Sequence, residues 1–206
     1  MKRTMKTGFT LAEVLITLAI IGVVAAMSIP ALIGSTNQQE YKVAFKKAVA
    51  VLNQAITMSI ALDSTDAASC PGCSADGTTG GLALANYFRN RLNIIADGPA
   101  PGNSFYTADG MLYSFFKRST NACSVANTTT TTDYASAPCI VLVDINGIKG
   151  PNSLSTGSGN TAVFKDQYYV IIKDSTAVPG FTANTTVAQD ALNYANTRSI
   201  KGRINI

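Results

Sequence analysis

The stretch FTLAEVLITLAIIGVVAAMSIPALI, residues 9–33, decides the architecture of this chain. Its single charged residue is Glu13, so residues 14–33 form an uncharged run of 20 residues. A helix of this length spans the hydrocarbon core of a bilayer, because each residue adds about 1.5 Å. The sequence therefore predicts a transmembrane helix near the N-terminus.

The residues before this stretch set its orientation. Lys2, Arg3 and Lys6 lie just before the apolar run, and no matching basic cluster follows it directly. Basic residues next to a membrane span favour the cytoplasmic side. We therefore expect the N-terminus in the cytoplasm and the rest of the chain on the outer side of the membrane.

Three interpretations of the apolar segment compete: a removed secretory signal, a plain anchor, or a specialised helix. A secretory signal has an apolar core of about 7–15 residues and small residues at the cut, which Ala25 and Ala26 could supply. The run here is longer. A carboxylate such as Glu13 at membrane depth costs a few kcal/mol and is usually paired and functional. These features favour a specialised helix.

A basic leader ending in Gly8, followed by Phe9-Thr10-Leu11-Ala12-Glu13 and an apolar run, resembles the prepilin signature of type IV pilins and type II secretion pseudopilins. The resemblance covers about 25 residues and implies that a prepilin peptidase removes residues 1–8 and methylates Phe9. The mature chain would then have 198 residues (206 minus 8), with Glu13 as its fifth. It also implies an inner-membrane precursor whose head is periplasmic or extracellular.

The physical chemistry of Glu13 gives this resemblance a rationale. Cleavage creates a positive amine at Phe9, and the Glu13 carboxylate of one subunit could pair with the Phe9 amine of its neighbour. In a low dielectric an unpaired charge is costly, so such a pair would set the axial register of packed helices. The plainer alternative is that Glu13 reaches the cytoplasmic interface of an ordinary anchor.

The composition excludes several classes of function. The chain has no histidine, which removes serine triads and histidine-bearing zinc or non-haem iron sites. The chain has 16 basic and 12 acidic residues, and three of the basic ones lie in the leader. The rest of the chain therefore has 13 basic and 12 acidic residues and is nearly neutral. Basic groups spread this thinly give no strong nucleic-acid signal. We expect no enzyme activity and no cofactor.

The helical pattern continues beyond the membrane segment. In residues 34–62 an apolar stripe predicts an amphipathic continuation of the same helix, which must pack on something, most simply a sheet of the same chain. Its members are Tyr41, Phe45, Ala48, Val49, Leu52, Ile56 and Ile60. Pro30 and Gly34 should loosen or kink the helix before this stripe begins.

Residues 63–206 are expected to form a globular α+β head. A short helix is predicted at 82–94, and strands at 104–107, 111–117, 139–145 and 164–173. The dipeptide Asn146-Gly147 is a strong turn signal, and Thr128–Thr132 indicates an exposed loop. A further short helix at 187–196 is ambiguous. A long N-terminal helix with an antiparallel sheet is the arrangement that the resemblance to pilins implies.

Four cysteines lie at Cys70, Cys73, Cys123 and Cys139, and they allow three pairings. We favour Cys70–Cys73 with Cys123–Cys139. The latter pair encloses 15 residues, would stabilise the fold by about 3 kcal/mol and resembles the disulfide loop of many pilins. A zinc site and a thioredoxin-like Cys-Pro-Gly-Cys redox pair are weaker alternatives.

An oxygen-rich set, Asp144, Asn146, Asn152 and Asp166, is a weak candidate for calcium. Some pseudopilins bind calcium in C-terminal loops, but the EF-hand pattern fails here. A plain turn at Asn146-Gly147 explains these residues as well.

Four tyrosines in the head are candidates for a binding surface. They could form a stacking surface for nucleic acid or sugar, or simply half-buried sheet positions, which are commoner. The residues are Tyr106, Tyr113, Tyr168 and Tyr169.

The function expected from the sequence is a structural subunit of a type IV pilus or of a type II secretion or competence filament. Its partners would be the peptidase, like subunits and the inner membrane. The alternative is a minor, pilin-like tip protein that recognises DNA, a surface or a secreted substrate. A membrane-anchored redox enzyme is the third and weakest class.

Overall fold

The computed structural model describes residues 8–124, 137–150, 152–156 and 163–180, and for residues 31–36 and 38 it describes the backbone alone. The loop expected at Thr128–Thr132 and the helix expected at 187–196 lie outside the described residues. Within them the chain forms two helices and one six-stranded sheet. The elements are α1 (Leu11–Asp63), α2 (Gly77–Arg89), β1 (Ile94–Asp97), β2 (Ser104–Thr107), β3 (Leu112–Lys117), β4 (Cys139–Asp144), β5 (Gln167–Lys173) and β6 (Thr176–Pro179).

The chain divides into two compact units, Met1–Gln39 and Glu40–Ile206. The first holds the N-terminal part of α1, whose segment Leu11–Pro30 is long and apolar enough to cross a membrane. None of these 20 residues is buried within the chain. The predicted long apolar helix is confirmed, and its side chains need partners from outside this single copy.

The helix α1 stays α-helical through Pro30, so the loosening or kink predicted there does not end the helix. Proline removes one backbone hydrogen bond, and apolar helices tolerate this loss because small local adjustments satisfy the freed carbonyl. The structure therefore carries the helix as one element from Leu11 to Asp63.

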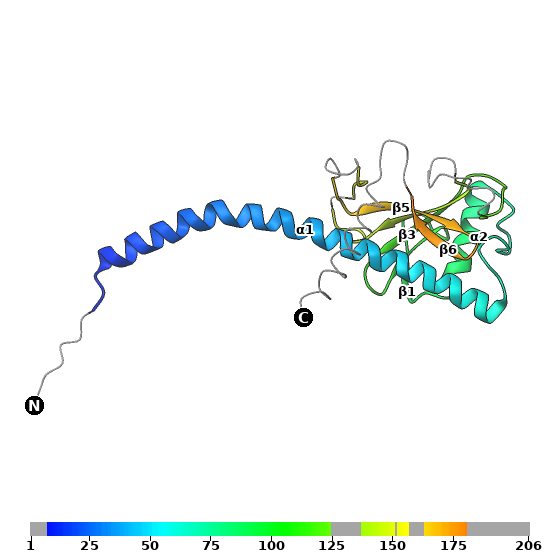
Figure 1. Ribbon diagram of the computed structural model, residues 1–206, viewed down its shortest axis with the longest axis horizontal. Helices are drawn as coiled ribbons and strands as arrows, with labels where there is room; N and C mark the ends of the chain where they lie inside the picture. Colours follow the sequence, from blue (N-terminus) through cyan, green and yellow to red (C-terminus); the bar gives the residue numbers. More distant parts are fainter. Residues whose placement is uncertain (1–7, 125–136, 151, 157–162, 181–206) are drawn as a thin grey trace, which may run out of the picture. The chain divides into compact units, whose positions relative to one another are not determined.

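The second unit, called the head below, contains the sheet and the last part of α1 (Figure 1). Neighbouring strands in the sequence are neighbours in the sheet, in the order β1 to β6, and each pair is antiparallel. The predicted α+β class with a pilin-like arrangement is thereby confirmed. The turn between β2 and β3 uses Gly110 at a φ of 84°, a value that glycine adopts without strain.

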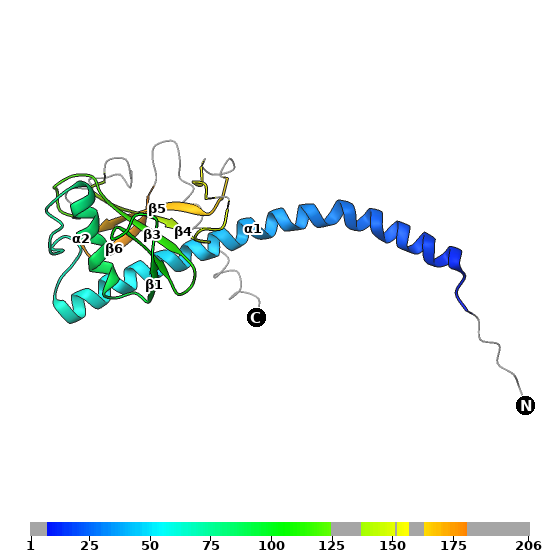
Figure 2. The ribbon, with the colours of Figure 1, turned by 180° about the vertical axis from the view of Figure 1, so that it is seen from behind.

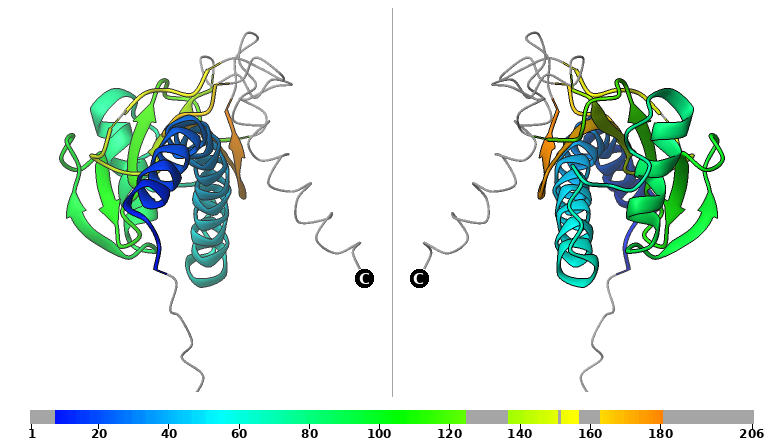
Figure 3. Two further views of the ribbon diagram at one scale, coloured as in Figure 1. Left: turned by 90° about the vertical axis from the view of Figure 1, so that its left-hand side faces the viewer. Right: turned by 90° about the vertical axis from the view of Figure 1, so that its right-hand side faces the viewer.

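The core of the head lies between α1 and one face of the sheet. In the end views of Figure 3, the part of α1 that belongs to the head runs between the green strands and the orange β6. Phe45 is fully buried and stacks on Tyr168 of β5, with ring centroids 4.3 Å apart. Asn53 fixes the edge strand β6, because its amide donates to the Ala177 carbonyl (2.9 Å) and accepts from the Ala177 N–H (2.8 Å).

The apolar stripe predicted on α1 is buried from Phe45 to Ile56, but its last member is not. Ile60 is 37% exposed, and Ser59 is buried in its place at 2%. At this end of α1 the buried contact is polar rather than apolar, because the guanidinium of Arg91 donates a hydrogen bond to the Ser59 hydroxyl (3.3 Å).

The helix α2 packs beside β3, where Phe88 lies over Phe115 at 5.2 Å (Figure 2). It begins five residues earlier than the sequence predicts. A side chain at Gly80 would place its Cβ 2.7 Å from Cγ of Lys117, and one at Gly81 would reach 3.0 Å from the Phe115 carbonyl. These glycines, which weaken a helix signal in the sequence, are what allow α2 to approach the sheet closely.

The predicted strands at 104–107, 111–117, 139–145 and 164–173 correspond to β2, β3, β4 and β5. Two short edge strands, β1 and β6, are not predicted from the sequence. The residues of β1 pair with β2 rather than extending α2, because an antiparallel register joins Ile94 to Thr107.

Candidate functional site

The first candidate site is the N-terminal motif. Gly8, Phe9 and Thr10 are exposed and precede the first helical residue, Leu11. Phe9 is 90% exposed. The peptide bond between Gly8 and Phe9 therefore lies outside the helix and is accessible without unwinding α1.

Glu13 and Thr10 form a reciprocal cap at the start of α1. The Glu13 carboxylate accepts hydrogen bonds from the Thr10 backbone N–H (2.8 Å) and from the Thr10 hydroxyl (2.9 Å). The Thr10 hydroxyl oxygen in turn accepts from the Glu13 N–H at 3.3 Å. This is the capping-box pattern Thr-x-x-Glu, which satisfies two otherwise unpaired donors of a helix N-terminus.

The capping box was missed in the sequence, although its signal, Thr10 three residues before Glu13, was present. Both bonds to Glu13 end on its Oε2 atom. Among the described residues, the hydrogen bonds to this carboxylate therefore use one of its two oxygens. One acidic side chain thus starts the helix and carries the single charge of the apolar segment Leu11–Pro30.

The cysteines form two disulfides in the head, Cys70–Cys73 and Cys123–Cys139. This is the pairing favoured from the sequence, and it uses all four cysteines of the chain. Cys139 begins β4 opposite Lys117 of β3, so the second disulfide ties the segment after β3 to the sheet centre. No thiolate is left to bind zinc through cysteine.

The Cys70–Cys73 disulfide lies in a turn rather than at a helix terminus. The residues are only 6% and 3% exposed, and α2 begins at Gly77, beyond the motif. Redox-active Cys-x-x-Cys pairs are partly exposed and sit at helix N-termini, where the thiolate is stabilised. The geometry supports a structural disulfide.

The weak calcium candidates have other tasks in the structure. Asp166 is fully buried, and its two carboxylate oxygens accept the N–H groups of Asn152 (2.6 Å) and Ser153 (2.8 Å). Asp144 is 2% exposed and accepts from Gln167 Nε2 at 2.9 Å and from the Asn146 N–H at 3.3 Å. Among the residues that the structure describes, no group of three or more Asp, Glu, Cys or His side chains is placed to hold a metal ion. These carboxylates fold the loops around β4 and β5.

The tyrosines do not form a joint surface. Tyr113 and Tyr168 are buried in the core, whereas Tyr106 and Tyr169 are half-buried. Desolvation raises the pKa of both buried phenols far above the usual value, which is typical of core positions.

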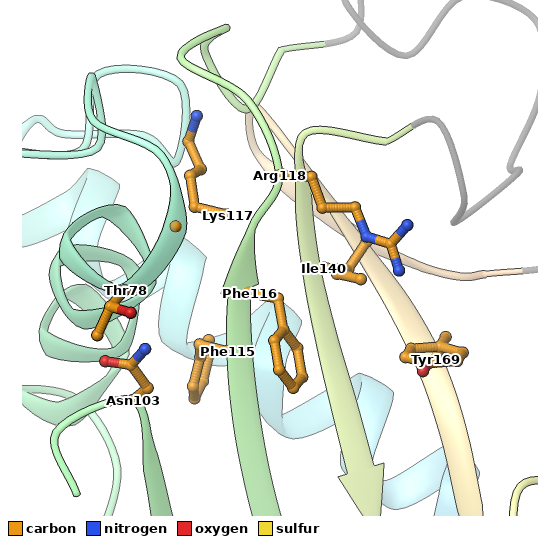
Figure 4. Close-up of a pocket in the computed structure, with 9 residues that line it drawn as sticks. Thr78, Asn103, Phe115, Phe116, Lys117, Arg118, Ile140 and Tyr169 are labelled. Atoms are coloured by element: carbon orange, nitrogen blue, oxygen red, sulfur yellow. The ribbon is translucent and has the colours of Figure 1, made fainter. Parts of the chain in front are cut away.

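One hollow on the head combines polar and aromatic groups (Figure 4). It has a volume of about 380 Å³ and is lined by Thr78, Asn103, Phe116, Arg118 and Tyr169 among others. Phe116 is 43% exposed. An amide, a hydroxyl and a guanidinium around an aromatic floor are groups that hold a small polar ligand.

The N-terminal residues match one family model, the prokaryotic N-terminal methylation motif, over residues 3–29. The match includes Gly8, Phe9, Thr10 and Glu13 and covers 27 of the 206 residues (3 to 29 inclusive). This motif marks structural pilin-type proteins rather than an enzyme family. Neither the curated proteins nor the solved structures contain a match to the chain.

The motif and the fold agree with each other. A methylation motif stands at the start of a long apolar helix, and the head is an α+β unit with an antiparallel sheet. These are the features of a type IV pilin-like precursor. Membrane anchoring by the N-terminal helix is consistent with both.

Proposed function

We propose that this chain is a structural subunit of a type IV pilus, or of a type II secretion or competence filament. It would assemble from the inner membrane after a prepilin peptidase cuts between Gly8 and Phe9. The observation that carries the proposal is the coincidence of the methylation motif with an apolar helix whose residues are all unburied in the single chain. Copies of that helix packed together would replace lipid contacts by protein contacts.

Processing is the first step of the proposed function. The exposed, non-helical backbone at Gly8 and Phe9 suits proteolysis, and the basic leader holds this bond on the cytoplasmic side. The new amine of Phe9 is then methylated. Two disulfides in the head fit an oxidising compartment on the opposite side of the membrane.

Docking is the second step. After cleavage, the Phe9 amine is a cation at membrane depth and the Glu13 carboxylate is the anion nearest to it in the sequence. In the precursor, Thr10 satisfies Oε2 of Glu13, so Oε1 can accept the amine of a neighbouring copy. An isolated charge at this depth costs a few kcal/mol, so the paired register is favoured over shifted ones.

The alternative function is that of a minor subunit that binds a ligand at the tip. The specific observation in its favour is the hollow beside Phe116 and Arg118. Abundance separates the two roles, since a major subunit forms the bulk of purified filaments. A tip protein appears there in traces, and substitution of Arg118 by Ala would abolish ligand binding without loss of filaments.

The proposed function is tested by mass spectrometry of the chain from its native membrane. We expect a product that begins at Phe9 with one added methyl group. Gly8→Val should leave the uncut precursor, because the side chain occupies the cleavage position. Glu13→Gln should be cut and methylated but absent from filaments. Filaments of normal yield from Gly8→Val would overturn the proposal, as would a product cut near Ala26.

A further inference from the structure

The hollow that Phe116 lines lies on the outer face of the sheet, the face turned away from α1. Along β3 the side chains alternate, so Phe115 is fully buried in the core and Phe116 is 43% exposed on the other side. Tyr168 of β5 stacks on Phe45 of α1, which places the next residue, Tyr169, on the outer face as well. The hollow is therefore separate from the contacts between α1 and the sheet.

The hollow has an apolar floor of its own. Phe116 lies opposite Ile140 in the register of β3 and β4, and Ile140 lies opposite Ile171 in the register of β4 and β5. Ile140 and Ile171 are buried in a small cluster separate from the main core, and Tyr169 packs against this cluster. An exposed aromatic ring beside a row of buried aliphatic side chains offers a flat apolar surface to a ligand.

The hollow exists because β2 is shorter than β3. The strand β2 pairs with only the first half of β3, so Phe116 has no β2 residue beside it. Beyond that point the Asn103 carbonyl accepts the Phe115 N–H at 2.8 Å, and Gly77 at the start of α2 forms an isolated bridge with Lys117. Backbone contacts to β3 therefore hold both segments that border the hollow on this side.

Polar groups lie on two sides of the apolar floor. Thr78 of α2 and Asn103 stand on one side of the hollow. A Cβ added at Gly81 would lie 2.8 Å from Nδ2 of Asn103, so the carboxamide packs closely against α2. On the other side, Figure 4 shows the Arg118 side chain extending from the end of β3 across β4 toward Tyr169. A hydroxyl and an amide can thus bind one edge of a ligand while a guanidinium binds the opposite end.

The charge of the hollow favours an anion. Among the described residues that line it, Lys117 and Arg118 are basic and none is acidic. The Lys117 ammonium donates to the carbonyls of Ser119 and Asn121, so Arg118 is the cation that reaches over the floor. The Arg118 backbone N–H donates to the Pro138 carbonyl at 2.8 Å, which fixes the base of its side chain. A guanidinium binds a carboxylate through two parallel hydrogen bonds.

We propose that this hollow binds a carboxylated sugar, such as a uronic acid unit of a polysaccharide. The apolar face of the sugar ring would lie on Phe116, and its carboxylate would pair with Arg118. The hydroxyl groups of the sugar would bond to Thr78 and Asn103. The volume of about 380 Å³ is at the small end of the range for ligand pockets and suits one or two sugar rings. The inference goes beyond the proposed filament role and names the ligand class for the alternative role.

A single-stranded nucleic acid fits the hollow less well than a sugar does. Such strands bind through several cations that follow the phosphates and through aromatic side chains on which successive bases stack. In the hollow one guanidinium reaches over the floor, and Phe116 is exposed whereas Tyr169 is half-buried. A single guanidinium beside a single exposed ring matches a ligand with one carboxylate.

The test is a titration of the full-length chain in detergent micelles with D-glucuronate and with D-glucose, measured by saturation-transfer NMR. The two sugars differ only in the carboxylate that replaces a hydroxymethyl group. We expect D-glucuronate to bind at least about tenfold more tightly, because hydrogen bonds to charged groups are the stronger ones. Arg118→Gln should lower the affinity for D-glucuronate to that for D-glucose, whereas Phe116→Ser should weaken the binding of both sugars.

Lys149→Gln is the matched control, because it removes the same charge from an exposed residue outside the hollow. It should leave both affinities unchanged, and Arg118→Lys should keep part of the preference for D-glucuronate. Equal losses in Lys149→Gln and Arg118→Gln would reveal a general charge effect and overturn the inference. Equal binding of the two sugars by the unchanged chain would also overturn it.

Filament formation separates this inference from the proposed function. Arg118→Gln should still be cut after Gly8 and should give a normal yield of filaments. Normal filaments from a chain that binds neither D-glucuronate nor D-galacturonate would overturn the inference and leave the proposed function intact. A thymidylate tetranucleotide that binds more tightly than D-glucuronate, and is lost in Arg118→Gln, would make the hollow a nucleic-acid site and also overturn the inference.

Discussion

At the scale of single residues, Thr10 and Glu13 do two tasks with one set of bonds. Their reciprocal hydrogen bonds begin α1, and the same bonds supply the carboxylate with two donors from its own chain. A carboxylate at membrane depth is tolerated when its lone pairs are satisfied. Thr10 therefore stabilises the start of α1, and the proposed docking would use Oε1 of Glu13.

Substitution of Thr10 tests this role. Thr10→Val keeps the size of the side chain but removes its hydroxyl, so the helix start should lose about 1 kcal/mol. Amide hydrogen exchange at residues 11–14 in detergent micelles should become correspondingly faster. Thr10→Ser keeps the hydroxyl and should behave as the unchanged chain. Equal exchange rates in the Val and Ser variants would show that the cap is unimportant.

The charge of Asp144 should lower the stability of the head near neutral pH, and this effect should disappear in acid. Burial raises the pKa of Asp144, although Gln167 opposes the shift. The ionised form is thus disfavoured in the folded state, and this cost disappears as the pH falls through the raised folded pKa. Asp144→Asn keeps only one of the two hydrogen bonds that the carboxylate accepts, but it also removes the buried charge, so its stability relative to the unchanged chain should be higher near neutral pH than in acid, where Asp144 is protonated.

Asp109 is the matched control, because its pKa is shifted in the opposite direction to that of Asp144. Burial acts to raise the pKa of Asp109, but the Thr107 hydroxyl and Lys47, at 2.9 Å, outweigh it and the net pKa is lowered. Asp109→Asn should therefore destabilise near neutral pH, and less so in acid. Thermal unfolding of the detergent-solubilised chain from about pH 4 to about pH 8 measures both slopes. Parallel curves for the two variants would contradict the assignment.

At the scale of secondary-structure elements, the two disulfides constrain loops of different length. Cys123–Cys139 spans a sequence separation of 16 residues, and Cys70–Cys73 a separation of 3. On the loop-entropy model, replacing the long pair by serine should cost about 3 kcal/mol and replacing the short pair about half as much. Urea unfolding of the two double variants measures the difference. A larger loss for the Cys70 and Cys73 variant would show that native packing, not loop entropy, decides.

The sequence predicts the central elements and misses those that depend on a neighbour. β4 and β5 are apolar enough to be recognised alone, and their turn carries Asn146-Gly147. The strand β6 is only four residues long and is held by the side chain of Asn53, a polar residue 124 positions away. No local pattern contains that contact. The glycines at the start of α2 are likewise explained only by the proximity of β3.

The same distinction applies to the candidate site. Gly8, Phe9 and Glu13 lie in one short segment, so the sequence alone shows the resemblance to the prepilin signature, and the match over residues 3–29 agrees with it. A groove lined by Ile95, Tyr106 and Ile148, among others, unites residues from α1, β1, β2 and the turn after β4. Its members are brought together only by the sheet register, which the sequence does not specify.

At the scale of the whole molecule, the boundary between the two compact units at Glu40 predicts which part folds alone. A chain that begins at Glu40 retains Phe45 and the rest of the buried stripe of α1, and it lacks every residue of the apolar span. It should fold with its near-UV circular dichroism intact. It should also remain monomeric by light scattering, because it lacks the apolar span whose side chains are unburied in the single chain.

A chain that begins at Val51 is the matched variant for that experiment. It keeps the sheet and both disulfides but loses Phe45, Ala48 and Val49, all of which pack in the core. Loss of a buried phenylalanine alone costs about 3–5 kcal/mol, a large part of the 5–15 kcal/mol that stabilises a typical domain. This chain should therefore unfold or expose apolar surface to a fluorescent dye. If both truncated chains fold equally well, α1 is an appendage of the head; if neither folds, the head needs the residues before Glu40. Either result would contradict a head whose core is completed by its own segment of α1.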